Sequence, residues 1–280
     1  MSTSGGLRSQ HISASDLPGK PLVSIITVTY NAQKHLEQAM LSVLEQTYDN
    51  IEYIVIDGGS TDNTLDIIRK YEDRLALWRS EPDKGIYDAM NKGLAEARGT
   101  LIAFKNADDV FVPEALALAV EAFLKTDADV IYGNTYKLWS ESPRRVSLII
   151  SDHNKLNISS RVDHRSTFFR TALHKKHPFD LRFGIVADYK VLLEIRRSGG
   201  KFVHVPHVFS LMRFGGHSDT FRVYSELRDA QAEFFGRTHA WQIWGLNVMR
   251  YTMNSMKNSI LKTVLGEAGF AKFKQRKVKK

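Results

Sequence analysis

The sequence contains no cysteine, so disulfide bonds, thiolate nucleophiles and cysteine-ligated zinc are excluded. It also lacks any run that approaches the roughly 18 consecutive apolar residues of a membrane-spanning helix, and we expect no transmembrane segment. Residues 1–20 are rich in serine and glycine and contain no apolar run. That composition argues against a secretory signal and predicts a disordered leader. These absences favour a protein of the reducing cytoplasm.

Positive charge is concentrated at the end of the chain. The formal net charge is +8, and such an excess favours nucleic acid or an anionic membrane as a partner. Six cations lie within the last ten residues: Lys272, Lys274, Arg276, Lys277, Lys279 and Lys280. The rest of the chain is therefore nearly balanced. We interpret the basicity as the property of a tail and expect no nucleic-acid partner.

Short apolar, β-branched segments alternate with segments of helical periodicity in the first half of the chain. The predicted strands are residues 23–30, 51–56, 75–78, 101–104 and 129–132. The predicted helices follow Asn31, follow Ser60 or Thr61, cover residues 86–98, and begin at Pro113. This alternation is typical of an α/β domain with a mostly parallel sheet. Beyond about residue 220 the pattern becomes helical.

Polar residues follow three of the predicted strands at the point where each strand ends. They are Thr29, Tyr30 and Asn31, then Asp57, Gly58, Gly59 and Ser60, then Asn106, Asp108 and Asp109. Parallel sheets bind their ligands beyond the carboxyl ends of the strands, so three such groups predict one shared site. Two roles are open for Asp57: it accepts hydrogen bonds from a ribose or a base, or it holds the turn that leads into the next helix.

Asp108 and Asp109 are adjacent carboxylates after a buried strand, and they repel each other unless a cation neutralises them. A few hard oxygen ligands suit Mg²⁺ or Mn²⁺, which take further oxygens from water and from a diphosphate. The alternative is that one of the two carboxylates caps a helix near Pro113.

The segment 81–93 is dense in polar side chains close to a predicted helix start. Asp83 and Lys84 are placed there to bind a ribose and a diphosphate, with help from the helix N-terminus. By composition alone, the segment is a capped amphipathic helix.

Four of these segments resemble, in order, the signature of family 2 glycosyltransferases. They read Thr-Val-Thr-Tyr-Asn, Ile-Asp-Gly-Gly-Ser-Thr-Asp-Asn-Thr, Glu-Pro-Asp-Lys-Gly-Ile-Tyr-Asp-Ala-Met-Asn-Lys-Gly and Asn-Ala-Asp-Asp. The resemblance is greatest to bacterial enzymes of exopolysaccharide and colanic-acid-type assembly. It implies a GT-A domain over residues 21–220, a Rossmann-like, mostly parallel sheet flanked by helices. Residues 221–280 then form a helical, basic C-terminal extension.

The resemblance also implies roles for individual residues. The residues expected to bind the nucleotide sugar are Thr29, Tyr30, Asn31, Asp57, Asp83, Lys84, Asn106, Asp108 and His164. Asn106, Asp108 and Asp109 stand at the Asp-x-Asp metal motif of the family. Because the first acid of that motif is asparagine here, we expect Asp108 and Asp109 to hold Mn²⁺ or Mg²⁺.

Three later segments extend the resemblance. Residues 164–169, His-Arg-Ser-Thr-Phe-Phe, match a stretch that has glutamine in place of Arg165 in such enzymes. Ala-Asp-Tyr around Asp188 matches an acid that serves as general base, which an inverting transfer needs to remove the acceptor proton. The alternative role of Asp188 is as the N-cap of a helix over residues 189–197. Residues 215–218, Gly-Gly-His-Ser, resemble a loop near the active site.

We therefore expect an inverting, metal-dependent transfer of a sugar from a nucleotide diphosphate donor, most commonly UDP among relatives, to an acceptor hydroxyl in bacterial surface glycan assembly. One rival is a sugar nucleotidyltransferase, which needs a glycine-rich, basic loop where this chain has Thr-Tyr-Asn. The other is a non-catalytic adaptor for membranes or nucleic acid. It leaves the strand-end acids unexplained, because acids repel phosphate unless a metal intervenes.

The C-terminal extension carries an apolar stripe beside its cations. The stripe consists of Ile260, Leu261, Val264, Leu265 and Ala268. A basic amphipathic helix of this kind lies in the interface of an anionic membrane. We therefore expect a cytoplasmic enzyme, peripheral on the inner face of the plasma membrane, with a glycan or lipid-linked acceptor. The alternative is that the stripe packs on the catalytic domain and the lysines form a solvated tail.

Overall fold

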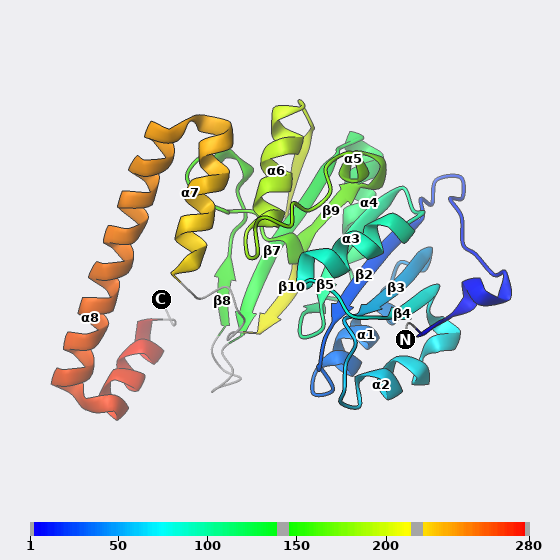
Figure 1. Cartoon of the computed structure of the whole chain (residues 1–280), viewed down its shortest axis with the longest axis horizontal. Helices are drawn as coiled ribbons and strands as arrows, with labels where there is room; N and C mark the ends of the chain where they lie inside the picture. Colours follow the sequence, from blue (N-terminus) through cyan, green and yellow to red (C-terminus); the bar gives the residue numbers. More distant parts are fainter. Residues whose placement is uncertain (1–2, 139–145, 214–220, 278–280) are drawn as a thin grey trace.

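The structure is a computed structural model that describes residues 3–138, 146–213 and 221–277. Its centre is a mixed sheet with the strand order β1-β4-β3-β2-β5-β9-β7-β10-β6, and β8 pairs with β7 (Figure 1). The strands are β1 Thr3–Gly5, β2 Val23–Thr29, β3 Ile51–Asp57, β4 Leu77–Ser80, β5 Leu101–Asn106, β6 Val110–Phe111, β7 Val130–Leu138, β8 Val146–Ile149, β9 Thr167–Arg170 and β10 Phe202–Arg213.

Helices cover both faces of this sheet (Figure 1). They are α1 Leu36–Leu44, α2 Thr64–Lys70, α3 Ile86–Glu96, α4 Ala115–Thr126, α5 Thr171–Lys176, α6 Ala187–Arg197, α7 Arg222–Phe235 and α8 Arg237–Lys277. The short 3-10 segments among the described residues are η1 Leu7–Gln10, η2 Glu72–Arg74, η3 His153–Lys155 and η4 His164–Ser166. The loop expected at residues 215–218 lies outside the described residues.

Four neighbouring strands, β4, β3, β2 and β5, run parallel, in agreement with the predicted α/β domain. β9 departs from this direction, because it lies antiparallel between β5 and β7.

Two helices begin later than predicted. Asn31 takes a φ of 48°, which asparagine tolerates in turns, and α1 begins only at Leu36. α2 begins at Thr64, because Ser60 and Thr61 belong to the loop before it.

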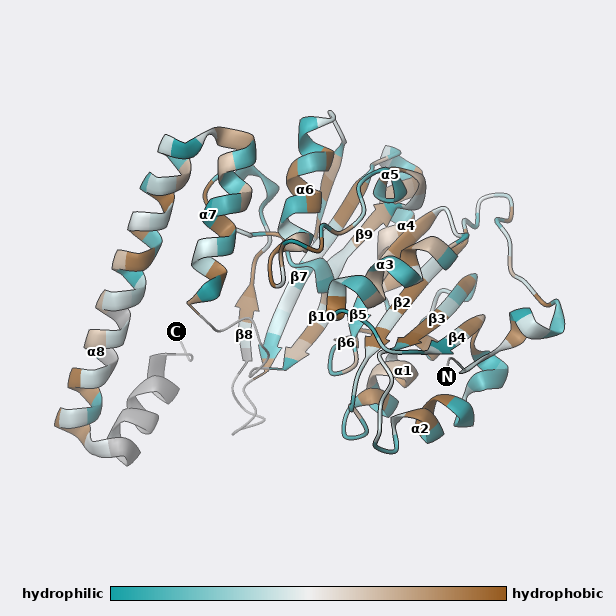
Figure 2. Ribbon diagram, viewed as in Figure 1, coloured by the Kyte–Doolittle hydropathy of each residue, from teal (hydrophilic) through white to brown (hydrophobic). Residues whose placement is uncertain are grey.

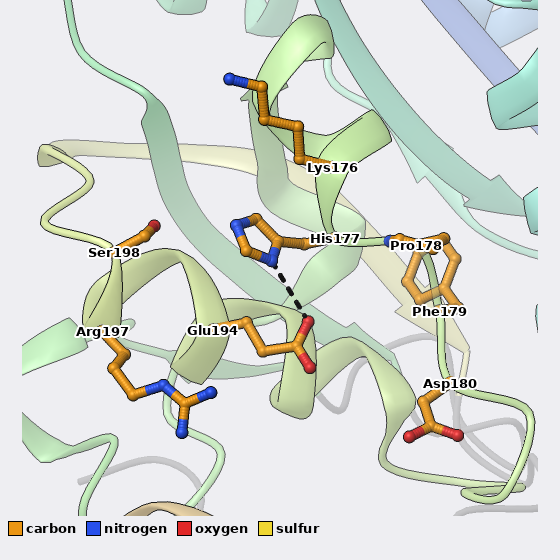
Figure 3. A pocket seen from close by; sticks show the side chains of 8 residues that line it. All are labelled: Lys176, His177, Pro178, Phe179, Asp180, Glu194, Arg197 and Ser198. Carbon is orange, nitrogen blue, oxygen red and sulfur yellow. Dashed lines mark ion pairs between the residues drawn. The ribbon is translucent and has the colours of Figure 1, made fainter.

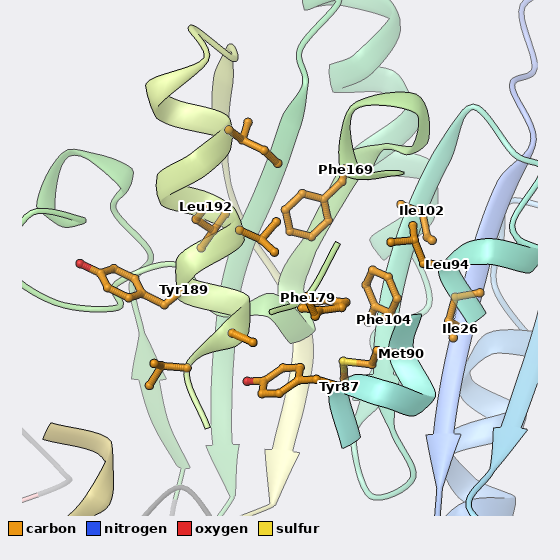
Figure 4. Close-up of a cluster of buried hydrophobic side chains, with 14 of the residues drawn as sticks. Ile26, Tyr87, Met90, Leu94, Ile102, Phe104, Phe169, Phe179, Tyr189 and Leu192 are labelled. Carbon is orange, nitrogen blue, oxygen red and sulfur yellow. The ribbon is translucent and has the colours of Figure 1, made fainter. Parts of the chain in front are cut away.

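Alternate residues of the central strands face two separate hydrophobic layers. On β2, Ile26 faces a layer covered by α3, α6 and α7, whereas Ile25 faces a layer covered by α1 and α4. Figure 4 shows the first layer, where Leu94 of α3 and Leu192 of α6 pack with the strands. α3 lies so close to β2 that a Cβ atom at Gly93 would collide with Ile26. The two layers together hold the sheet from both faces.

The prediction of a disordered leader over residues 1–20 is wrong for residues 3–20. β1 pairs antiparallel with β4. The guanidinium of Arg8 forms a 2.5 Å ion pair with Glu52, and both side chains are buried. Glu52 also accepts a 3.0 Å hydrogen bond from the backbone N–H of Gly99. A segment rich in serine and glycine is ordered here because one of its charged side chains has a buried partner.

α7 and α8 form the helical C-terminal part that the sequence predicts. α7, however, is not a separate extension. Its Leu227 and Ala230 are buried in the same hydrophobic layer as α6, and Glu226 accepts a 2.8 Å hydrogen bond from the backbone N–H of Ile185. α8 lies alongside α7 (Figure 1) and is interrupted at Gly266, which has a φ of 65°. The predicted boundary at residue 220 therefore separates α7 from the core that it helps to form.

We predict that Arg8→Met lowers the free energy of unfolding by about 3 kcal/mol, because removing one partner of a buried ion pair leaves the other charge uncompensated. Urea unfolding followed by circular dichroism measures the change. Lys125→Met is the matched control, since its ion pair with Glu121 is exposed and its loss should change the midpoint little. Equal midpoints for Arg8→Met and the wild type would contradict an anchoring role for this pair.

Candidate active site

The loops after β2 and β3 are joined at the carboxyl edge of the sheet. The backbone N–H of Gly58 donates to the carbonyl oxygen of Thr29 (2.9 Å). Asn31 Oδ1 accepts a hydrogen bond from the backbone N–H of Thr61 (2.9 Å), and the hydroxyl oxygen of Ser60 accepts one from the N–H of Asn31 (2.8 Å). The first two polar groups of the sequence thus lie together. Their contact with a ligand stays a prediction.

Thr29 and Tyr30 present unused groups at this edge. The hydroxyl of Thr29 is buried and has no hydrogen-bond partner within the described ranges. The Tyr30 side chain is 63% exposed. An exposed ring beside an unpaired hydroxyl offers a stacking face and a hydrogen bond, a combination that suits a nucleoside.

Asp57 is fully buried, and both of its carboxylate oxygens are engaged by the protein. Oδ2 accepts hydrogen bonds from the backbone N–H groups of Gly59 (3.1 Å) and Ser60 (2.9 Å) and from the hydroxyl of Ser80 (2.6 Å). Gly59 has a φ of 85°, a conformation that favours glycine. Of the two roles open to Asp57, the structure shows the one that holds the turn. Its contact with a ribose or a base stays a prediction.

Asp83 and Lys84 lie just before α3, and Asp83 faces the loop after β3. A Cβ atom at Gly58 would lie 2.5 Å from Asp83 Oδ2, so the missing side chain at Gly58 admits Asp83 to the edge of the site. Asp83 Oδ1 accepts a hydrogen bond from the backbone N–H of Gly85 (2.8 Å). Lys84 has an exposed side chain. The structure therefore places Asp83 beside the loop that Asp57 holds.

The turn after β5 carries the residues predicted to hold a metal. Neither Asp108 nor Asp109 caps α4, whose N-cap is Glu114, so the capping alternative is wrong. Asp109 is 1% exposed. Its Oδ2 and the Oδ1 of Asn106 are buried and have no hydrogen-bond partner in the part of the chain that the structure describes. Buried oxygens of this kind are costly unless a cation or a ligand satisfies them.

This donor set fits a hard divalent cation. Among residues 3–138, 146–213 and 221–277, no cluster of three or more acidic or histidine side chains is placed to hold a metal. A site here would instead use the carboxylates of Asp108 and Asp109, which stay a prediction as ligands, and the unpaired amide oxygen of Asn106. Mg²⁺ and Mn²⁺ accept such a small set when water and a diphosphate supply the other oxygens.

A cluster of buried charges adjoins this turn, and the sequence analysis missed most of it. Lys105 of β5 is 1% exposed and donates hydrogen bonds to the carbonyl oxygen of Arg165 (2.9 Å) and to the hydroxyl of Ser210. The Nε–H of Arg165 donates to Asp163 Oδ1 (2.8 Å). A lysine within an otherwise apolar strand was the sequence signal for this cluster.

Burial shifts the protonation of this cluster. It raises the pKa of Asp109 to about 6, although Arg165 and Lys105 pull that pKa down. It lowers the pKa of Lys105 to about 7, against the attraction of Asp109. Burial would also lower the pKa of Arg165, but Asp163 and Asp109 outweigh it and raise that pKa, with a smaller contribution from Asp188. Arg165 thus interacts with the acids at both ends of the cluster.

Asp188 and His164 form a hydrogen-bonded pair between α6 and η4. Nδ1 of His164 lies 2.7 Å from Asp188 Oδ2. Oδ1 of Asp188 accepts a hydrogen bond from the backbone N–H of Tyr189 (2.8 Å). The hydroxyl of Tyr87 lies 3.1 Å from the same oxygen and 2.7 Å from the carbonyl oxygen of Ile185, so its single proton is shared. The structure therefore groups His164, predicted to bind the nucleotide sugar, with the predicted base.

Asp188 does not cap its helix. α6 begins at Ala187, and Val186 is its N-cap, so the capping alternative is wrong. Burial would raise the pKa of Asp188, but the hydrogen bond from His164, together with the His164 charge, outweighs it and lowers that pKa. Asp188 is therefore an ionised carboxylate near neutral pH.

A surface hollow elsewhere on the molecule is not part of this site. It lies between α5 and α6, and the residues that line it include His177, Phe179 and Glu194 (Figure 3). His177 Nδ1 lies 3.5 Å from Glu194 Oε2. None of the predicted site residues lines this hollow, so we assign the chemistry to the strand ends.

The parallel strands, with polar loops at their carboxyl ends and an acidic turn after β5, are those of a GT-A glycosyltransferase. TarS of S. aureus in complex with UDP-GlcNAc has this fold, with a TM-score of 0.62 and 19% identity over 80% of this chain and 70% of that one. The mannosyltransferase PcManGT from Pyrobaculum calidifontis, in complex with GDP-Man and Mn²⁺, has a TM-score of 0.53 and 20% identity over 77% of this chain and 62% of that one. At such identities the likeness shows the fold alone.

The chain belongs to glycosyl transferase family 2, whose sequence model matches residues 24–220. An uncharacterized glycosyltransferase of Mycobacterium tuberculosis is 37% identical over 184 residues, which cover 62% of this chain and 68% of that protein. A PGL/p-HBAD biosynthesis glycosyltransferase of Mycobacterium bovis is 32% identical over 209 residues, which cover 71% of this chain and 80% of that protein. The family predicted from the sequence is confirmed, and the protein is a glycosyltransferase.

We predict that Asp109→Asn raises the melting temperature at pH 7.5 in the presence of a chelator, by about 2–6 °C. Because the folded-state pKa of Asp109 is raised to about 6, the wild type loses stability as pH rises through that value. The variant avoids this loss. As the pH falls below about 6, Asp109 takes up a proton in the folded wild type, so the difference in melting temperature should shrink and vanish only as the pH reaches the ordinary carboxyl pKa of 3.8. Thermal unfolding across this pH range measures the effect, and a constant difference would contradict it.

Proposed function

We propose that the protein transfers a sugar, with inversion at its anomeric carbon, from a nucleotide diphosphate donor to an acceptor hydroxyl group. One observation carries the proposal: η4 connects the turn that holds the unpaired buried oxygens of Asn106 and Asp109 with Asp188. The carbonyl oxygen of Arg165 on η4 accepts a hydrogen bond from Lys105, the residue before Asn106, and His164 on η4 bonds to Asp188. The turn with Asn106 and Asp109 suits a diphosphate with its cation. The pair of Asp188 and His164 suits an acceptor hydroxyl group that must lose a proton.

We favour a uridine nucleotide as the donor. The exposed ring of Tyr30 and the unpaired hydroxyl of Thr29 would stack on the base and bind the nucleoside. TarS of S. aureus binds UDP and UDP-GlcNAc, whereas PcManGT binds GDP-Man, so the fold accepts more than one nucleotide. Thermal stabilisation by UDP, GDP and dTDP in Mn²⁺ would distinguish these donors.

Different residues of the site would act on the donor and on the acceptor. Asp108 and Asp109 would hold Mn²⁺ or Mg²⁺, which when bound supplies positive charge against the negative charge of the departing diphosphate. Inversion requires the acceptor to attack from the face opposite that diphosphate, with a base at the acceptor oxygen. Asp188 and His164 would form that acceptor side.

Both rival functions lack support from the site. A sugar nucleotidyltransferase would need a glycine-rich, basic loop after β2, and that loop is instead Thr-Tyr-Asn, held by Ser60 and Thr61. A non-catalytic adaptor would not explain the buried oxygens of Asn106 and Asp109 that have no hydrogen-bond donor among the described residues. The family match over residues 24–220 favours the enzyme over both.

α8 carries an apolar stripe that is longer than the sequence analysis expected. Its large side chains recur every three or four residues and are exposed: Leu246, Met249, Met253, Met256, Ile260 and Val264. Figure 2 shows hydrophobic positions recurring along α8. Of the predicted stripe, Ile260, Val264 and Leu265 are exposed, and the side chain of Ala268 lies outside the described residues. The alternative that these three side chains pack on the catalytic domain is therefore wrong.

The charge of this helix favours an anionic membrane over a second copy of the chain as the partner of the stripe. Residues 237–280 contain ten lysines and arginines but a single acid, Glu267. Two such helices would repel each other, whereas each cation near an anionic bilayer contributes about 1 kcal/mol of attraction. Within the described residues, no helix combines the length and hydropathy needed to span a bilayer.

We therefore place the enzyme peripherally on the inner face of the plasma membrane. Its acceptor there would be a glycan or a lipid-linked intermediate of surface glycan assembly. The name of the M. bovis relative, a PGL/p-HBAD biosynthesis glycosyltransferase, supports a biosynthetic role for the transfer.

We predict that the double change Asp108→Ala and Asp109→Ala abolishes sugar transfer and weakens nucleotide diphosphate binding in Mn²⁺, because the cation loses its two protein carboxylates. Donor hydrolysis and calorimetric titration with the nucleotide measure the two effects. Asp66→Ala removes an exposed acid on α2 and serves as the control. Full activity of the double variant, or of the wild type in excess chelator, would sink the metal proposal.

We predict that the full chain pellets with anionic liposomes at low salt and is released as salt rises. Met253→Ser with Ile260→Ser, or removal of residues 257–280, should prevent pelleting while donor hydrolysis persists. Leu124→Ser is the control, because it removes an exposed apolar side chain of α4 instead. Undiminished pelleting of the truncated chain would exclude the tail as the anchor. A salt-resistant dimer in solution would favour a second copy as the partner.

A further inference from the structure

We propose that Met249, Met253 and Met256 of α8 are sites of reversible oxidation by a peroxide, and that their oxidation releases the enzyme from an anionic membrane. The proposal rests on the membrane docking proposed above and adds its regulation. It follows from the position of these three thioethers on the exposed stripe, and from the burial of the other methionines that the structure describes.

The three methionines lie on one face of α8, and that face points away from α7. Their spacing of four and three residues places them on the same side of the helix. The opposite side packs on α7: Ala240 is fully buried, and the ring of Tyr251 lies 5.6 Å from that of Tyr224. Met249 and Met253 are each two residues from Tyr251, which places them roughly 200° around the helix from it. The stripe therefore faces solvent in the free protein.

Exposure separates these three methionines from the others. They are 51%, 61% and 64% exposed. Met40, Met90 and Met212 are at most 7% exposed, and Met1 lies outside the described residues. Because oxidation requires access to the sulfur, the core protects the buried thioethers and leaves those of the stripe open to attack. The chain has no cysteine, so all of its oxidisable sulfur atoms are thioethers.

The oxidation is balanced with a peroxide as the only co-reactant. The peroxide transfers one oxygen atom to the sulfur: its O–O bond breaks, an S–O bond forms, and hydrogen peroxide leaves as water. The sulfur loses two electrons, and the peroxide gains them. A thiol-dependent methionine sulfoxide reductase reverses the step, with two thiols as the source of electrons and water as the product.

Oxidation removes the apolar character of half of the stripe. A sulfoxide is polar, whereas a thioether is apolar, so three of the six large side chains named above would no longer favour the apolar part of a bilayer. The cations beside the stripe, Arg250 and Lys257 among them, are unchanged by a peroxide. Their attraction to anionic lipids persists but is screened by salt. Oxidation therefore leaves binding that is weak and sensitive to salt.

The test uses the full chain and vesicles of phosphatidylglycerol and phosphatidylcholine. The protein is treated with hydrogen peroxide, catalase removes the excess, and mass spectrometry of its peptides locates the added oxygen atoms. Burying one methionine side chain in an apolar phase strengthens binding roughly tenfold, so oxidation of all three should lower the vesicle partition coefficient by about 10²-fold or more. Donor hydrolysis in solution should stay unchanged, and a methionine sulfoxide reductase with a thiol should restore pelleting.

The triple variant Met249→Leu, Met253→Leu and Met256→Leu is the matched control. Leucine keeps the stripe apolar and favours a helix as well as methionine does, but it has no thioether. This variant should pellet with the vesicles both before and after peroxide.

Three results would overturn the proposal: release of the leucine variant by peroxide, full pelleting of wild type whose three stripe methionines are oxidised, or oxidation of the buried methionines ahead of the exposed ones. A wild type that does not pellet before treatment would instead overturn the proposed docking, and the regulation with it. The proposed sugar transfer would be untouched by any of these results.

Discussion

The pairing of β2 between β3 and β5, all in one direction, is the constraint on which the site depends. Thr29 is in register with Asp57, and Val28 with Asn106. Because the three strands end at the same edge, their loops meet there without any long excursion of the chain. The close approach of α3 at Gly93 and the layer beneath α4 hold this edge from both faces. Apart from His164 on η4, every residue that we assign to donor binding or to the metal is placed by this arrangement or by the segment before α3.

The edge also gathers charge that the interior must neutralise. β5 contributes Lys105 and leads to Asp109. Arg165 of η4 and Asp163, the N-cap of η4, lie beside them. Opposite charges stabilise one another there, yet oxygens of Asn106 and Asp109 stay unpaired among the described residues. Such a site costs stability in the free protein, and a ligand that satisfies the oxygens recovers it.

The sequence predicted the elements whose signal is local. Apolar strands and their polar ends located Thr29, Asp57 and Asp109, and the resemblance to a family located Asp188. The sequence could not predict that β9 inserts antiparallel between β5 and β7, because that pairing depends on contacts between residues far apart in the chain. The pairing of His164 with Asp188 across 24 positions depends on the same packing. The ion pair of Arg8 with Glu52 depends on a remote contact too, and the composition of residues 3–20 alone therefore predicts a disordered leader.

The hydrogen bond that the backbone N–H of Ile185 donates to Glu226 limits where the chain can be joined to another member of this family in a chimera. α7 holds the segment that leads into Asp188, and its Leu227 and Ala230 fill the layer behind α6. A chimera joined at residue 220 would remove a hydrogen-bond acceptor and two core side chains from behind the segment that leads into Asp188. A chimera joined at Gly236, between α7 and α8, would keep all three. The modular boundary of the enzyme therefore lies one helix later than the boundary of the family signature.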